Sequence, residues 1–147
     1  MFDTEGFENA SFYPRQKVVS VKALAAFFLD GAEPEFTVRG LTSDELHSSV
    51  EAGSRAKTLD NVVRAIGENK EAVNAIREAI GLKEDTPAEV RKRIEMLVAG
   101  CVKPVFSHRT AAKLAENFPI EFMLLTNEIT ELTGLGASLE KPSADSP

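Results

Sequence analysis

The side chains that could do chemistry in this sequence are few, and no spacing brings them together. The two histidines, His47 and His108, have no His, Cys or carboxylate at metal-ligand spacing such as H-E-x-x-H. The single cysteine, Cys101, falls on the apolar stripe of an expected helix, where burial makes a thiol a poor nucleophile. The sequence therefore predicts no catalytic residue, no metal ligand and no cofactor, and we expect the protein not to be an enzyme.

Two further motifs have structural explanations. The G-x-G fragment at residues 134–136 follows an expected helix instead of opening one, so it predicts helix termination and not a phosphate site. The basic triplet at residues 91–93 lies between Glu89 and Glu95, which partly cancel its field. We therefore expect the triplet to lie on a solvated helix face.

Composition places the chain among ordinary globular proteins. It has 147 residues, of which 43% are hydrophobic and 27% charged, enough for one domain with its own core. Its net charge of −6 argues against nucleic acid as a partner, because phosphate contacts need clustered Lys and Arg. No apolar run approaches the roughly 20 residues that cross a bilayer, and the acidic first residues are unlike a secretory signal. We expect a cytoplasmic protein without a membrane partner.

The expected fold class is mainly α: a multi-helix domain with a small N-terminal β element. Residues 1–15 are interpreted as an irregular arm, residues 16–134 as the helical domain and residues 135–147 as a flexible tail. Aromatic residues of the arm either fold back on the domain or dock on a partner, and folding back is the favoured interpretation. These aromatic residues are Phe2, Phe7, Phe12 and Tyr13.

The β element is expected before residue 40. Valines at residues 18–21 favour an extended segment, and the Ala-rich residues 23–26 favour a helical turn. Turn-forming residues follow at 30–34. Residues 35–39 then alternate apolar and polar side chains, which predicts a half-buried strand.

Capping residues divide the rest of the chain into helices. A capping box at Thr42 and Glu45 starts a helix that Gly53 weakens at its end. Caps, prolines and helical periodicity predict further helices at residues 58–66, 68–80, 86–103, 107–118 and 119–134. The expected inward stripes of the helices at 86–103 and 119–134 are Val90, Ile94, Leu97 and Cys101, and Phe122, Leu125, Ile129 and Leu132.

The last expected helix has more apolar residues than one buried stripe requires. Successive residues advance by about 100°, so Leu124 points roughly opposite Phe122. Residues 96–99 repeat this pattern. Such a turn is either covered on two sides by the protein's own core or offers a patch to another chain. The candidate partner-binding residues are Met96, Met123 and Leu124.

Three stretches resemble the tail assembly chaperones of long-tailed bacteriophages and their prophages. They are FTVRGLTSDEL (residues 36–46), RIEMLVAGCVKP (93–104) and AAKLAENFP (111–119), the last with its continuation LTNEITELTG (125–134). The resemblance spans residues 18–134. It rests on the order and spacing of packing and capping patterns, since none of the stretches is a catalytic signature.

This resemblance implies a non-enzymatic assembly factor of the host cytoplasm that is absent from the mature virion. Members of the family are thought to coat the long helical tape measure protein and to recruit tail tube subunits. The tape measure protein and the tail tube protein are therefore the expected partners, and self-association into a homo-oligomer is a further open alternative. Two other classes also stay open. One is a structural phage tail or connector protein, and the other is a small helical DNA-binding regulator, although its best recognition helix, residues 90–101, is evenly charged.

Overall fold

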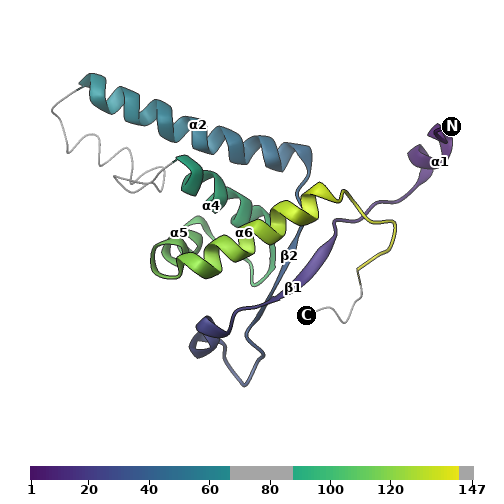
Figure 1. The fold of residues 1–147 in the computed structure, drawn as a ribbon, viewed down its shortest axis with the longest axis horizontal. Coiled ribbons are helices and arrows are strands. Elements are labelled where there is room, and N and C mark those ends of the chain that lie inside the picture. Colours follow the sequence, from purple (N-terminus) through teal and green to yellow (C-terminus); the bar gives the residue numbers. More distant parts are fainter. Residues whose placement is uncertain (67–87, 143–147) are drawn as a thin grey trace.

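The computed structural model describes residues 1–66 and 88–142. It confirms a mainly α fold with a small antiparallel sheet (Figure 1). The helices are α1 (Thr4–Asn9), η1 (Lys22–Phe27, a 3-10 helix), α2 (Ser43–Ile66), α4 (Ala88–Gly100), α5 (His108–Asn117) and α6 (Pro119–Gly134). The strands are β1 (Gln16–Ser20), β2 (Glu35–Arg39) and β3 (Cys101–Lys103). Within the described ranges, no helix has the length and hydrophobicity needed to cross a membrane.

The sheet has the strand order β1-β2-β3, and both strand pairs are antiparallel. The strands β1 and β2 confirm the predicted N-terminal β element. The strand β3 is not among the predicted elements, because the sequence predicts that the preceding helix continues to Lys103. The helix α4 instead ends at Gly100, because Cys101 pairs with Val38 of β2 and continues the chain as an edge strand.

The core lies where the sheet meets α4, α5 and α6. The helix α6 contacts β1, β2, α4 and α5, and its predicted inward stripe is fully confirmed, since all four residues are buried. The N-cap Ser107 accepts a hydrogen bond from the backbone N–H of Thr110 at 3.1 Å, and Pro119 opens α6, as predicted. The largest fully buried side chains are Val21, Val38, Ser49, Leu97, Leu125, Thr126 and Ile129.

The helix α2 is longer than predicted. It runs without a break through Gly53 and Thr58, where the sequence predicts an end and a new start. At Gly53 an added Cβ would lie 3.0 Å from the carbonyl oxygen of Ala88, so the glycine lets α2 approach the start of α4 closely. This packing against α4 stabilises a helix that the local pattern alone would interrupt. The helix predicted at residues 68–80 and the start of the one at 86–103 lie outside the described residues.

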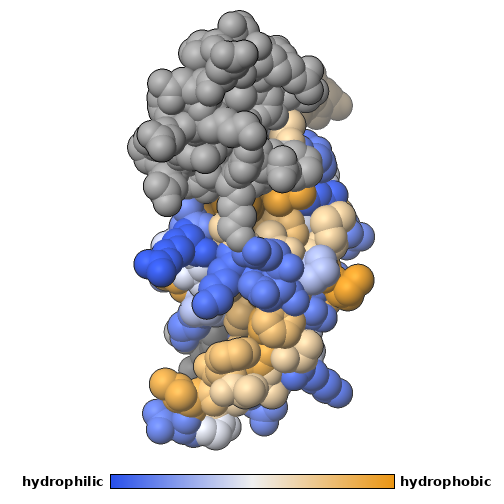
Figure 2. All heavy atoms as spheres, turned by 90° about the vertical axis from the view of Figure 1, so that its left-hand side faces the viewer, coloured by the Kyte–Doolittle hydropathy of each residue, from blue (hydrophilic) through white to orange (hydrophobic). Residues whose placement is uncertain are grey.

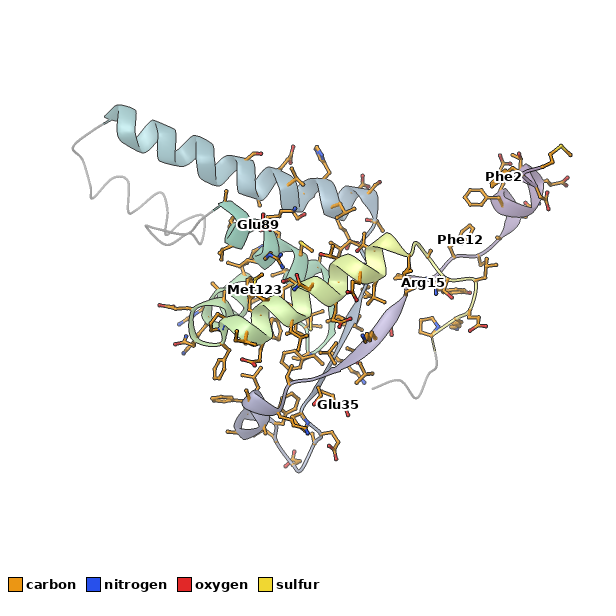
Figure 3. All side chains as sticks on the ribbon, viewed as in Figure 1. Phe2, Phe12, Arg15, Glu35, Glu89 and Met123 are labelled. Atoms are coloured by element: carbon orange, nitrogen blue, oxygen red, sulfur yellow. The ribbon has the colours of Figure 1, made fainter. Side chains whose placement is uncertain are left out.

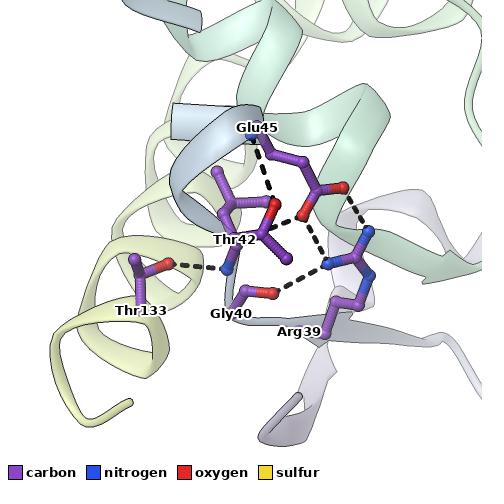
Figure 4. A network of polar contacts seen from close by, with 6 residues as sticks. Arg39, Gly40, Thr42, Glu45 and Thr133 are labelled. Atoms are coloured by element: carbon purple, nitrogen blue, oxygen red, sulfur yellow. Dashed lines mark hydrogen bonds and ion pairs between the residues drawn. The ribbon is translucent and has the colours of Figure 1, made fainter. Parts of the chain in front are cut away.

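A polar network fixes the start of α2 on the sheet and on α6 (Figure 4). The predicted capping box is confirmed: Thr42 N–H donates to Glu45 Oε1 at 2.9 Å, and Glu45 N–H donates to Thr42 Oγ1 at 3.3 Å. Arg39 also donates to both carboxylate oxygens of Glu45, at 2.9 and 2.6 Å. Leu41 N–H donates to Thr133 Oγ1 of α6 at 2.9 Å. The Glu45 carboxylate therefore joins β2 to α2, and the neighbouring hydrogen bond from Leu41 to Thr133 joins the same region to α6.

The N-terminal arm does not fold back on the domain, which corrects the favoured interpretation. It contains the short helix α1 and extends away from the body (Figure 1). Its root is tied to the C-terminal segment, because Tyr13 and Ser138 exchange backbone hydrogen bonds of 2.8 and 2.7 Å, and Arg15 Nε donates to the Gly136 carbonyl at 3.1 Å. The segment expected to be a flexible tail is thus anchored at Ser138.

Candidate protein-binding site

An apolar groove of about 1450 Å³ lies between η1 and α5. The helix η1 is anchored because Val21 and Leu24 are buried, and this leaves Phe27 and Leu29 facing outward with 73% and 76% of their surface exposed. Apolar side chains from separate segments of the chain complete the groove. They are Phe28, Ala32, Phe36, Pro104, Phe106, Leu114 and Phe118.

Aromatic contacts set the base of the groove. The ring centroid of Phe36 lies 5.6 Å from that of Phe28 and 5.3 Å from that of Phe106, the second pair in an edge-on arrangement. The strand β2 therefore connects the η1 side of the groove to the segment that leads into α5. These contacts join the three rings into one apolar base.

Charged side chains edge this groove. Lys103 comes from β3 and Arg109 and Lys113 come from α5, whose Ala111 and Leu114 face the core. Glu33 and Glu35 come from the segment that enters β2. In the part of the chain that the structure describes, none of these five side chains has an opposite charge within 4.0 Å. The groove thus suits an apolar segment with charges on its flanks.

Figure 2 views the α5 side of the molecule, which is the left-hand side of Figure 1. Hydrophobic side chains gather at the lower end of this face, below a band of hydrophilic side chains. An exposed apolar area bordered by charge is typical of a surface that binds another protein.

A second apolar surface lies on α6 and contains two of the three predicted partner-binding residues. Met123 and Leu124 are each 40% exposed, and Ile120 is also exposed. These three residues, the α6 stripe, have the spacing i, i+3 and i+4, which places them on one side of the helix. The positions of Met123 and Leu124 agree with the expectation of an outward apolar patch.

The third predicted partner-binding residue, Met96, is buried. Only 4% of its surface is exposed, and it belongs to the core. The helix α4 contacts α2, α5 and α6, so its apolar turn is covered on more than one side by the protein itself. The expectation that Met96 is presented to a partner is therefore wrong.

The basic triplet at residues 91–93 does not form a solvated face. Arg91 is buried and pairs with Glu95 at 3.5 Å. Arg93 donates to Glu89 at 3.2 Å and to Thr126 at 2.6 Å, which links α4 to α6. Arg91 and Arg93 therefore form contacts within the molecule instead of facing solvent.

The residues considered for chemistry remain separate. His47 pairs with Glu51 at 3.2 Å and His108 with Glu95 at 2.7 Å. Burial raises the pKa of the Cys101 thiol to about 12. Within residues 1–66 and 88–142, no three His, Cys, Asp or Glu side chains gather as a metal site would require.

The groove was not among the sequence predictions. Its residues come from segments 24–36 and 103–118, and no short pattern shows that they meet. One signal in the sequence could have indicated an exposed apolar surface here. Three large apolar residues at 27–29 come directly before a turn, and a turn leaves little room to bury all three.

Comparisons of the chain with models of protein families, with curated proteins and with solved structures found no match.

Proposed function

We propose that this protein is a non-enzymatic tail assembly chaperone of a long-tailed bacteriophage or prophage. In this role it binds the tape measure protein and recruits tail tube subunits during tail assembly. It acts in the host cytoplasm and is absent from the mature virion. The observation that carries the proposal is the α6 stripe, an apolar surface on a helix whose opposite side already fills the core.

Helical clients suit this surface. An amphipathic helix can place its apolar side on an exposed apolar stripe, with contacts repeated at i, i+3, i+4 and i+7. Met123 contributes a flexible, polarizable side chain that adapts to different apolar shapes along a long client. The net charge of −6 keeps a protein with such a surface soluble before it is loaded.

Coexpression with the long gene product encoded immediately downstream tests this function. Alone, that product is expected to aggregate, whereas with the wild-type chaperone it stays soluble and co-purifies with many chaperone copies. If the two proteins do not associate, the proposed function is wrong. Recovery of the protein from purified phage tails would favour a structural connector instead.

The variant Leu124→Asp tests the role of the α6 stripe. It places a charge on the stripe without entering the core, so it is expected to fold and to lose the client. Val50→Asp is the matched control, because it charges an exposed apolar residue on α2. Thermal unfolding shows whether both variants are folded. A folded Leu124→Asp variant that keeps the client as soluble as wild type does would show that the α6 stripe is not the binding surface.

A further inference from the structure

The N-terminal arm carries an exposed aromatic cluster. The rings of Phe2 and Phe7 lie 5.3 Å apart and those of Phe7 and Phe12 lie 5.2 Å apart, measured between centroids. All three side chains are exposed, and α1 has no buried residue. Exposing three grouped phenylalanines to water is unfavourable in free energy for a monomer. The cluster therefore indicates that another chain covers it.

The arm and the groove of one molecule lie at opposite ends of β1. The root of the arm is fixed beside the start of β1, where Gly40 N–H donates to the Arg15 carbonyl at 2.9 Å, and η1 follows the other end of the strand. Figure 3 shows Phe2 and Phe12 at the upper right of the molecule and Glu35, which lines the groove, near its lower edge. A strand of this length separates its ends by about 17 Å. The aromatic cluster therefore lies at the end of β1 that is far from its own groove.

The arm and the groove have complementary chemistry. Residues 1–13 contain three acidic side chains, Asp3, Glu5 and Glu8, and no Lys or Arg. The groove offers an apolar base and, from β3 and α5, three cations that have no carboxylate partner among the described residues. Glu33 and Glu35 come from the segment that enters β2, so the acidic arm is matched by the β3 and α5 part of the groove. The groove's volume of about 1450 Å³ exceeds the ~300–1,000 Å³ usual for a small-molecule site, as a peptide segment requires.

We propose that the aromatic arm of one molecule docks in the groove between η1 and α5 of a second copy. The phenylalanines cover the apolar base, and the arm's carboxylates face Lys103, Arg109 and Lys113. Because the two contacting surfaces differ, each copy can donate an arm and accept another. Such a head-to-tail contact produces an open chain or a closed ring of copies.

Two variants with complementary defects test this contact. The arm variant carries Phe2→Ser, Phe7→Ser and Phe12→Ser, and the groove variant carries Phe27→Ser and Leu29→Ser. All five residues are exposed, so both variants are expected to fold. Sedimentation velocity over a range of protein concentrations measures the mass of each.

Wild type is expected to form assemblies larger than a dimer as concentration rises, whereas each variant alone stays a monomer. A mixture of the two is expected to form a 1:1 dimer that grows no further, because only one intact arm and one intact groove meet. Wild type that stays monomeric, a groove variant that still assembles, or a mixture that does not associate would each overturn the proposal.

A peptide of residues 1–15 separates this contact from any other self-association. It is expected to bind the arm variant, whose groove is free, and to bind several-fold to about tenfold more weakly after Arg109→Glu and Lys113→Glu, because two exposed charge pairs are lost. No binding of the peptide to the arm variant would refute arm docking. These measurements need no tape measure protein, so their outcome is independent of the proposed chaperone function.

Discussion

Glu45 offers the clearest quantitative test of how the fold is held. The side-chain hydrogen bonds from Arg39, together with the backbone N–H of Thr42, lower the pKa of this carboxyl to about 2. Compared with a pKa of about 4.3 in an unfolded chain, this corresponds to about 3 kcal/mol, since a tenfold change in proton affinity is about 1.4 kcal/mol. Solvent still reaches the pair, whose side chains are 26% and 22% exposed, so screening reduces the expected contribution to about 1–2 kcal/mol.

Glu45→Gln isolates the charge, because glutamine can keep the capping hydrogen bond and cannot form the ion pair. A lowered folded-state pKa stabilises the fold above the unfolded pKa of about 4.3, and this stability is lost as pH falls towards about 2. Urea unfolding at neutral pH should therefore show a loss of about 1–2 kcal/mol, and the difference from wild type should shrink between about pH 4 and pH 2.

Glu140→Gln is the control for Glu45→Gln, since it neutralises an exposed glutamate and should change little. A stability difference between Glu45→Gln and wild type that is the same at pH 7 and pH 3 would refute the ion-pair explanation. So would a Glu45→Gln variant as stable as wild type at neutral pH.

Three further outcomes are expected. Cys101, with its raised pKa, should react with a thiol reagent only after unfolding, and rapid reaction of the native protein would contradict its burial. Gly100→Ala should lower the free energy of unfolding by about 1 kcal/mol, because a Cβ there would lie 2.8 Å from Ile129 Cδ1, and Ile129→Val should relieve part of this loss in the double variant. Mild peroxide should oxidise Met123 before Met96, which peptide mass spectrometry detects; the reverse order would contradict their burial.

Local signals predicted much of the fold correctly. The capping box at Thr42, the N-cap at Ser107 and the proline that opens α6 are interactions between residues a few positions apart, so their residue types alone indicate the helix start. The turn at residues 30–31 is equally local, since Asp30 and Gly31 both adopt positive φ.

Long-range contacts account for the errors. The strand β3 exists because Cys101 finds a partner in Val38, and α2 continues through Gly53 because α4 packs against it. Met96 is buried because α4 has neighbours on more than one side. None of these partners is visible in a window of neighbouring residues, so helical periodicity alone predicted a longer α4, a shorter α2 and an exposed Met96.

The exposed apolar residues of the α6 stripe support the proposed binding role because the fold itself does not explain them. Once Phe122 and Leu125 face the core, the advance of about 100° per residue turns Met123 and Leu124 away from it. A polar side chain at either exposed position would cost the fold little, since substitutions at such surface sites usually change stability by about 0.5 kcal/mol or less. The fold therefore does not require apolar residues there, whereas a surface that covers the apolar side of a helical client does.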